Sequence, residues 1–421
     1  MTAGGASSTD TGRAIEAAFR IERARLIAGL ARTVRDLDRA EELAQDALLV
    51  ALAEWPKTGV PEKPGAWLMA VAKRRAIDAI RHDQMRTRKH EEIARETDEA
   101  VGTEAIEAAM DDDLGDELLG LIFAACHPLL PAEARAALTL RVVGGLTASE
   151  IARAFLASEP TVAQRIVRAK KTIAKAQLRF EVPRGAELAA RLPSVLEVIY
   201  LVFNEGYSAT AGEDLVRVDV AQEAIRLGRI LAALMPRESE VLGLTALMEI
   251  QSSRLRARTG PDGSLAPIME QDRARWDQLS IRRGLDALAR AEAQGGNGPY
   301  VLQAALAACH ARARRPGDTD WMRIAGLYDR LREVMPSPVV DLNRAIAHSM
   351  AFGPDAGLRL LDALADAGAL RNYAPLPAAR GDFLFRAGRL PEARTQFESA
   401  AALTRNERER SFLLSRAEAC G

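Results

Sequence analysis

Apolar side chains recur at intervals of three and four residues along most of this 421-residue chain, a spacing that predicts helix rather than strand. In residues 13–54 the pattern runs through Ile15, Phe19, Leu26, Leu30 and Leu43. The composition agrees with it, because aromatic residues make up only 5% of the chain while Ala, Leu and Arg are abundant. Alanine and straight-chain residues lose little entropy in a helix. We therefore predict an all-α fold, divided into two to four units because domains cluster near ~100–150 residues.

Two features of the sequence limit where the chain works. It has no apolar run approaching the ~18 residues that cross a bilayer, and residues 1–10 lack a charged start followed by an apolar core. Cys126, Cys309 and Cys420 are odd in number and widely spaced, which argues against a disulfide framework or a cysteine-based zinc site. We expect a cytoplasmic protein that neither spans a membrane nor is secreted.

A proline- and glycine-rich segment separates the first two predicted helices. Residues 55–65 contain three prolines and two glycines, which cannot continue the helix predicted before them. A second helix is expected over residues 66–90, with an apolar stripe through Trp67 and Leu68. Its other faces are basic, with Lys73, Arg74, Arg75 and Arg81 among them. Taken alone, such a face is more often a solvated surface than a binding site.

The charge then changes sign. Residues 91–117 contain twelve acidic side chains and one basic side chain, Arg95. The segment offers little apolar surface to bury, so we interpret it as a flexible linker.

Residues 118–180 carry the pattern of a helix-turn-helix. Thr147 and Glu150 form a capping box at the start of a short helix, and Ser158 caps the next helix ahead of Pro160. This second helix is predicted to bury Val162, Ile166, Ala169 and Ile173 and to expose Thr161, Gln164, Arg165, Arg168 and Lys171. An ordinary helical hairpin is the alternative. The caps, the turn and the one-sided basicity together favour DNA binding, in which cations neutralise phosphates and polar side chains reach base edges.

The rest of the chain consists of long predicted helices. A turn is expected at residues 259–264, and helix pairs recur at intervals in the thirties after residue 298. The clearest pair spans residues 379–400, where Gly381, Ala393 and Ala400 allow two helices to approach closely around Phe397. This is the pattern of a tetratricopeptide repeat and predicts an α-solenoid at the C-terminus.

Residues that could carry catalysis are missing from the sequence. None of the five histidines stands at metal-ligand spacing with another histidine or a cysteine, except as adjacent pairs that point about 100° apart on a helix. No glycine-rich phosphate loop, nucleophile elbow or metalloprotease motif occurs. We therefore expect no enzyme activity, no metal and no cofactor.

Residues 13–180 resemble the bacterial extracytoplasmic-function sigma factors. The resemblance rests on the segments 36–47, 64–81, 146–152 and 161–170, which occur in the order of regions 2 and 4 of that family. It implies a region 2 helical bundle at 13–90, an acidic linker at 91–117 and a region 4 helix-turn-helix at 118–182. Two positions depart from the family pattern: Arg74 stands where most members have Asn, and Leu156 where they tend to have Gly in the turn.

The C-terminal half extends the resemblance. Residues 191–207 and the repeat at 379–400 are similar to the sigma subgroup with a tetratricopeptide extension. The resemblance implies a helical extension domain at 186–297 and repeat-like helices at 298–421, which regulate activity or bind a protein partner. It also implies that the chain binds the core RNA polymerase, through its clamp and flap, and promoter DNA.

The same resemblance implies roles for individual residues. Contacts with the polymerase are expected from Arg39, Glu42 and Asp46. Recognition and opening of the −10 element are expected from Trp67, Lys73, Arg74, Arg75 and Arg81. Recognition of the −35 element is expected from Thr161, Gln164, Arg165, Arg168 and Lys171. The competing hypothesis is an operator-binding helix-turn-helix regulator with a protein-interaction domain, which leaves the basic helix at 66–90 without a purpose.

Overall fold

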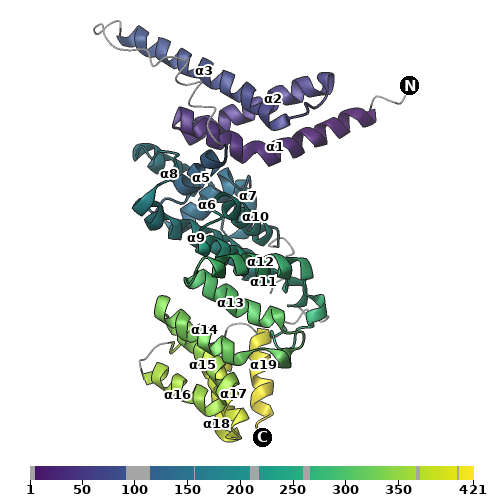
Figure 1. Ribbon diagram of the computed structural model, residues 1–421, viewed down its shortest axis with the longest axis vertical. Helices are drawn as coiled ribbons and strands as arrows, with labels where there is room; N and C mark the ends of the chain where they lie inside the picture. Colours follow the sequence, from purple (N-terminus) through teal and green to yellow (C-terminus); the bar gives the residue numbers. More distant parts are fainter. Residues whose placement is uncertain are drawn as a thin grey trace. The chain divides into compact units, whose positions relative to one another are not determined.

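The computed structural model describes residues 5–91, 114–155, 157–208, 218–258, 266–366, 370–404 and 407–421. Every regular element in these ranges is a helix, which confirms the all-α prediction (Figure 1). The chain divides into two compact units: unit 1 comprises residues 1–206 and 216–234, and unit 2 comprises residues 207–215 and 235–421.

The helices of unit 1 are α1 (Gly5–Val34), α2 (Leu37–Thr58), α3 (Pro64–Glu91), α5 (Leu114–Ala125), α6 (Ala132–Val142), α7 (Ala148–Ala154), α8 (Glu159–Lys175), α9 (Gly185–Ser208) and α10 (Val218–Leu234). Those of unit 2 are α11 (Ser239–Ser252), α12 (Gln278–Ala293), α13 (Pro299–Arg312), α14 (Trp321–Val334), α15 (Pro338–Phe352), α16 (Pro354–Asp366), α17 (Pro375–Arg386), α18 (Leu390–Leu403) and α19 (Glu407–Glu418). Short 3₁₀ turns lie at Leu255–Ala257, Arg273–Arg275 and Pro316–Asp318.

The helix expected over residues 13–54 is two helices. Arg35 has a left-handed backbone with φ of 54°, which ends α1. Asp36 then caps α2, its carboxylate accepting a hydrogen bond of 2.9 Å from the N–H of Arg39. The predicted break at 55–65 begins later than expected, because α2 continues through Pro56 to Thr58 and ends at Gly59, whose φ is 85°. A positive φ is what glycine adopts without steric cost.

Helices α1, α2 and α3 form a three-helix bundle. Its core contains Leu26, Leu30, Trp55 and Leu68, each no more than 1% exposed. Trp67 packs edge-on against Trp55, with ring centroids 5.2 Å apart, and so ties α3 to the end of α2. The basic face of α3 is thereby held on a rigid support.

Helices α9 and α10 pack on the helix-turn-helix part of unit 1. Arg191 of α9 donates to the carbonyl of Phe123 at 2.8 Å, and the hydroxyl of Ser194 donates to the carbonyl of Cys126 at 2.5 Å. From α10, Arg226 donates to the carbonyl of Val143 at 3.1 Å. The first two helices of the predicted extension at 186–297 therefore share a compact unit with residues 118–182.

Unit 2 is built from helices that pack against their sequence neighbours, as α14 does with α15 and α17 with α18 (Figure 1). The close approach predicted at residues 379–400 is present, because a Cβ added to Gly381 would lie 2.9 Å from the ring of Phe397. Ala393 and Ala400 are fully buried beside this contact. The assignment of these pairs as tetratricopeptide repeats stays a prediction.

Candidate nucleic-acid interface

The helix-turn-helix is built as its sequence predicts. At the start of α7, the N–H of Thr147 donates to the carboxylate of Glu150 at 2.7 Å and the N–H of Glu150 donates to the hydroxyl of Thr147 at 3.2 Å. The hydroxyl of Thr147 also donates to this carboxylate, at 2.8 Å, and the two hydrogen bonds that the carboxylate accepts from Thr147 lower the pKa of Glu150. At the start of α8, the hydroxyl of Ser158 accepts from the N–H of Thr161 at 3.3 Å. Leu156, in the turn, lies outside the described residues.

The two faces of α8 differ as expected. Val162, Ile166, Ala169 and Ile173 are buried against α6 and α7. Thr161, Gln164, Arg168 and Lys171 are exposed and lie on the opposite side of the helix. Exposed amide and guanidinium groups on the second helix of a helix-turn-helix are what major-groove readout requires.

Arg165 differs from the other four predicted −35 readers. It is half-buried, and its guanidinium lies 2.8 Å from the carboxylate of Glu133 on α6. This ion pair restricts the direction in which Arg165 points. Engagement of a phosphate or base by Arg165 therefore competes with Glu133.

The basic face of α3 is partly committed to contacts within the bundle. Arg74 is exposed, whereas Lys73 and Trp67 are half-buried. Arg75 is exposed and lies 2.8 Å from Asp46 of α2, so a predicted DNA contact and a predicted polymerase contact are paired with each other. The side chain of Arg81 lies outside the described residues.

The remaining predicted polymerase contacts, Arg39 and Glu42, are exposed on α2 and form an ion pair of 3.0 Å one helical turn apart. An exposed pair of this kind contributes little to stability. Both side chains can therefore exchange this contact for one with a partner at small cost.

A cluster of charges that sequence reasoning missed joins region 2 to region 4 inside unit 1. Glu41 of α2, only 13% exposed, lies 2.6 Å from Arg23 of α1 and 2.5 Å from the ammonium group of Lys170 of α8. The same ammonium lies 2.7 Å from Asp38, and Arg141 of α6 lies 3.5 Å from Glu41. We name these five residues the Glu41 cluster.

The electrostatics of the Glu41 cluster follow from its burial. Loss of water around Lys170 acts to lower its pKa, but hydrogen bonds from its ammonium to Asp38 and Glu41 outweigh this effect, and the pKa is raised. Burial also lowers the pKa of Arg23, against the opposing effect of Glu41. One sequence signal was available: Lys170 follows Ile166 by four residues, at the edge of the buried stripe of α8, where a solvated lysine is not expected.

Three segments of the chain match known families. Residues 19–86 match Sigma-70 region 2, residues 121–173 match Sigma-70, region 4, and residues 191–292 match a family of unknown function, DUF6596. A protein of Rhizobium meliloti (strain 1021) that carries the name "Uncharacterized protein R00370" is 43% identical over 406 residues, which is 96% of this chain and 95% of that protein. No solved structure matches the chain.

These matches and the helix-turn-helix geometry define the class of protein: a sigma factor of the extracytoplasmic-function type with a helical C-terminal region. The chain belongs to the sigma-70 family, whose members are DNA-binding transcription initiation factors rather than enzymes. Of the residues that the structure describes, no helix has the length and apolar character to cross a membrane.

Proposed function

We propose that this protein directs core RNA polymerase to specific promoters and initiates transcription there, and that its C-terminal helices regulate this activity or bind a partner. The observation that supports the proposal is the presence of two candidate DNA-binding elements in one chain: the basic helix α3 on its bundle and the exposed polar face of α8. A repressor that reads an operator needs only the second of these elements.

Recognition of the −35 element is assigned to α8. Thr161, Gln164 and Arg168 are exposed and are assigned to major-groove contacts, while Lys171 is assigned to a backbone phosphate. Arg165 also contacts DNA once its ion pair with Glu133 is broken. The four buried residues of the opposite face hold α8 at a fixed angle for this contact.

Recognition and opening of the −10 element are assigned to α3 and to the loop before it. Val60, in that loop, is 40% exposed and lies between Gly59 and Pro61, where a flipped base can be received. Extrusion of a base costs a few kcal/mol of stacking, which a shaped pocket recovers. Lys73, Arg74, Arg75 and Arg81 then follow the phosphates of the opened strand.

Polymerase binding is assigned to the exposed side of α2, through Arg39, Glu42 and Asp46, with the clamp as their partner and the flap as the partner of region 4. Asp46 must exchange its contact with Arg75 when polymerase binds. That exchange couples polymerase binding to the release of a DNA-contacting arginine.

The acidic segment is assigned to the RNA path of the polymerase. Residues 92–113 lie outside the described residues, so the proposal rests on the sequence: residues 91–117 carry twelve carboxylates and one base, Arg95. Carboxylates can mimic nucleic acid in a positively lined RNA path. Asp111→Asn, Asp112→Asn and Asp113→Asn together should change the ratio of abortive to full-length transcripts, and an unchanged ratio would favour a plain spacer.

Run-off transcription with purified bacterial core polymerase tests the proposal. The template is the region upstream of the protein's own gene, and the full chain is compared with a shortened chain that ends at Leu234. The cut falls after α10 because Arg191, Ser194 and Arg226 all hydrogen-bond to the helix-turn-helix part of unit 1. A cut at residue 184 would remove those contacts. A change in transcript yield could then come either from lost regulation or from a destabilised unit 1.

Specific transcripts from the full chain are the expected result. The shortened chain then reports whether unit 2 restrains or supports initiation, by the rise or fall in transcript yield. Tight operator binding by the protein alone, with no binding to core polymerase and no transcripts, would overturn the proposal in favour of the operator-binding regulator.

A further inference from the structure

Unit 2 contains a cavity of about 350 Å³ between α11, α13, α14 and α15. Its wall is largely apolar, with Leu247, Ile250, Leu306, Ile324 and Val340 among the lining residues. Cavities of this size and character commonly hold a small molecule. Among the described residues that line it, none is Asp or Glu.

Of the lining residues that the structure describes, only Arg254 carries a fixed charge; it follows α11 and is half-buried. Its guanidinium donates to the hydroxyl of Tyr207 at 2.6 Å and lies 5.7 Å from the ring of Trp276. Among the described residues no carboxylate lies within ion-pair distance of Arg254. These two contacts fix the position of the guanidinium without neutralising its charge.

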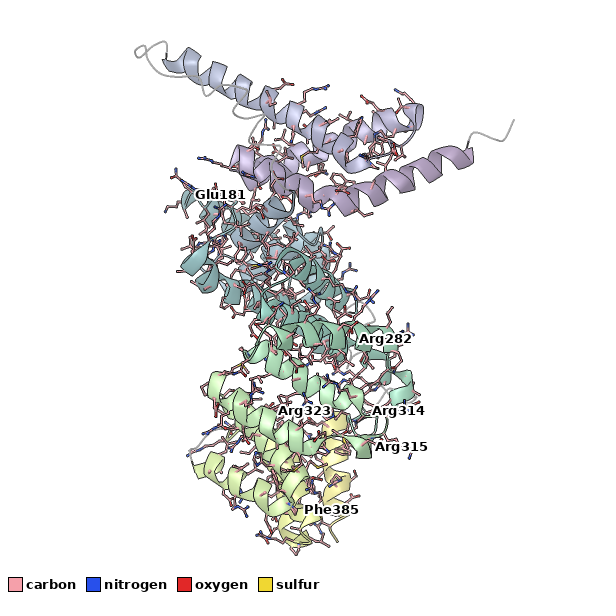
Figure 2. The ribbon with its side chains drawn as sticks, viewed as in Figure 1. Glu181, Arg282, Arg314, Arg315, Arg323 and Phe385 are labelled. Carbon is pink, nitrogen blue, oxygen red and sulfur yellow. The ribbon has the colours of Figure 1, made fainter. Side chains whose placement is uncertain are left out.

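Other arginines of unit 2 have a different setting. Arg282, Arg314, Arg315 and Arg323 are exposed on the outside of the unit (Figure 2). Arg323 lies 3.9 Å from Glu292, and its side chain is 48% exposed. A charge that is withdrawn from water and lacks a counter-ion is costly, so the cavity favours an anion at Arg254 more than the outer surface does.

His310 adds no second charge to the cavity. Burial, followed by the nearby charges of Arg254 and Arg273, lowers its pKa to about 4, so its ring is neutral at pH 7. Gln251, Gln303 and Asn343 also line the cavity and can donate hydrogen bonds. The cavity therefore combines an apolar wall, one cation and a few neutral donors.

We propose that this cavity binds a small amphipathic carboxylic acid, with its carboxylate on Arg254 and its hydrocarbon body against the walls from α11, α13 and α14. A peptide with an apolar C-terminus carries the same carboxylate. Its several peptide groups, however, would need more hydrogen-bond partners than the few polar side chains of this largely apolar lining supply. A small acid fits the apolar wall without that loss.

Isothermal titration of the full chain with decanoate, decanol and decylamine at pH 7 tests the proposal. Decanoate should bind saturably at one site. Decanol should bind about tenfold more weakly, because it lacks the charge-assisted hydrogen bond with Arg254. Decylamine, whose charge is repelled by Arg254, should bind more weakly than decanol.

Two variants locate the site. Arg254→Gln should remove the preference for decanoate over decanol, and Ala307→Phe should abolish binding of both, since Ala307 lines the cavity and a phenyl ring would fill it. The matched control is Ala402→Phe, which makes the same change at an exposed position of α18 and should leave both affinities unaltered. Ala307→Phe keeps the proposal testable if Arg254→Gln unfolds unit 2.

Equal affinities for decanoate and decanol, decanoate binding that persists in Ala307→Phe, or no decanoate binding at all would each overturn the proposal. Tighter binding of N-acetylated trileucine than of decanoate, lost in Ala307→Phe, would overturn it in favour of a peptide terminus. The experiment measures binding alone, so its result is independent of whether the protein initiates transcription.

Discussion

The ammonium group of Lys170 lies 2.7 Å from a carboxylate oxygen of Asp38, so the helix proposed to read DNA in region 4 is paired with the helix proposed to bind polymerase in region 2. The same ammonium reaches Glu41, which Arg23 and Arg141 also contact. Lys170 is 10% exposed, whereas Lys171, its neighbour, faces solvent. Two adjacent lysines of one helix therefore have different surroundings.

Replacement of Lys170 by Met should destabilise unit 1. The change leaves Glu41 buried with fewer cations around it, and we expect a loss of about 1–2 kcal/mol in the free energy of unfolding, measured by urea denaturation. Lys171→Met is the matched control and should change that free energy by less than about 0.5 kcal/mol, as exposed substitutions do. Equal effects of the two variants would mean that the Glu41 cluster contributes no more than an exposed ion pair.

Substitutions on the exposed face of α8 should have two distinct effects: some should lower the affinity for all DNA sequences, and others should lower the discrimination between sequences. Gln164→Ala should relax the preference for one base pair of the −35 element by about 1–3 kcal/mol and leave the salt dependence of promoter binding unchanged. Lys171→Ala should weaken binding to all sequences and reduce the slope of log K against log salt by about one. Both are measured with the protein bound to core polymerase on promoter fragments over a range of salt concentrations.

Arg179→Ala, at an exposed position after the end of α8, is the control for these variants and should alter neither quantity. If Gln164→Ala changed only the salt slope, α8 would contact phosphates and the sequence would be read elsewhere.

Local sequence signals predicted the helix-turn-helix correctly, because each depends on residues three or four apart. The Thr147 and Glu150 cap, the Ser158 cap and the buried stripe from Val162 to Ile173 all form as expected. The Glu41 cluster could not be predicted in this way, since Lys170 and Glu41 are 129 positions apart and only the packing of region 2 against region 4 brings them together. The pairing of Arg75 with Asp46 was not predicted either, because these residues are 29 positions apart and lie on different helices.

The helix expected over residues 13–54 shows a second limit of prediction from apolar spacing. Apolar spacing continues across Arg35 and Asp36 almost without interruption, so periodicity alone does not reveal the break. The break consists of the left-handed backbone at Arg35 and the N-cap at Asp36. Both belong to the turn that lets α2 pack against α1, which helical spacing does not report. At the other end, Pro56 was expected to end the helix, but α2 continues to Thr58.

Gly381→Ala should destabilise unit 2. The added methyl group would lie 2.9 Å from two carbon atoms of the Phe397 ring, and that ring is 3% exposed and has little room to move. We expect a loss of about 1–3 kcal/mol in the free energy of unfolding of unit 2.

Gly326→Ala is the matched control for this substitution. Gly326 lies within α14, and an added Cβ would meet no atom within 4 Å. Alanine favours a helix over glycine by about 1 kcal/mol, so this variant should be as stable as the parent protein or more so. Thermal and urea unfolding of both variants measure the difference. A Gly381→Ala protein as stable as Gly326→Ala would show that α17 and α18 can move apart.

The stability of unit 2 should fall as the pH is lowered from about 6.5 to about 4, because of His310. Above pH 6.5 its ring is neutral in both the folded and the unfolded chain. At lower pH the imidazole of His310 is protonated in the unfolded chain, whereas in the folded chain it stays neutral until the pH reaches its folded pKa of about 4. This pKa, against an ordinary 6.5, corresponds to a loss of about 3 kcal/mol in the free energy of unfolding between the two pH values.

His310→Phe isolates this contribution from that of the carboxylates. A phenyl ring keeps the edge-on contact with Trp321, whose ring centroid lies 5.5 Å from that of His310, and it replaces a buried Nδ1 that has no hydrogen-bond partner among the described residues. The variant should therefore match the parent protein at pH 7 and exceed its stability at pH 4.5 by about 2–3 kcal/mol in urea denaturation. Parallel curves for the two proteins from pH 7 to pH 4.5 would mean that His310 takes up its proton in the folded chain as readily as in the unfolded one.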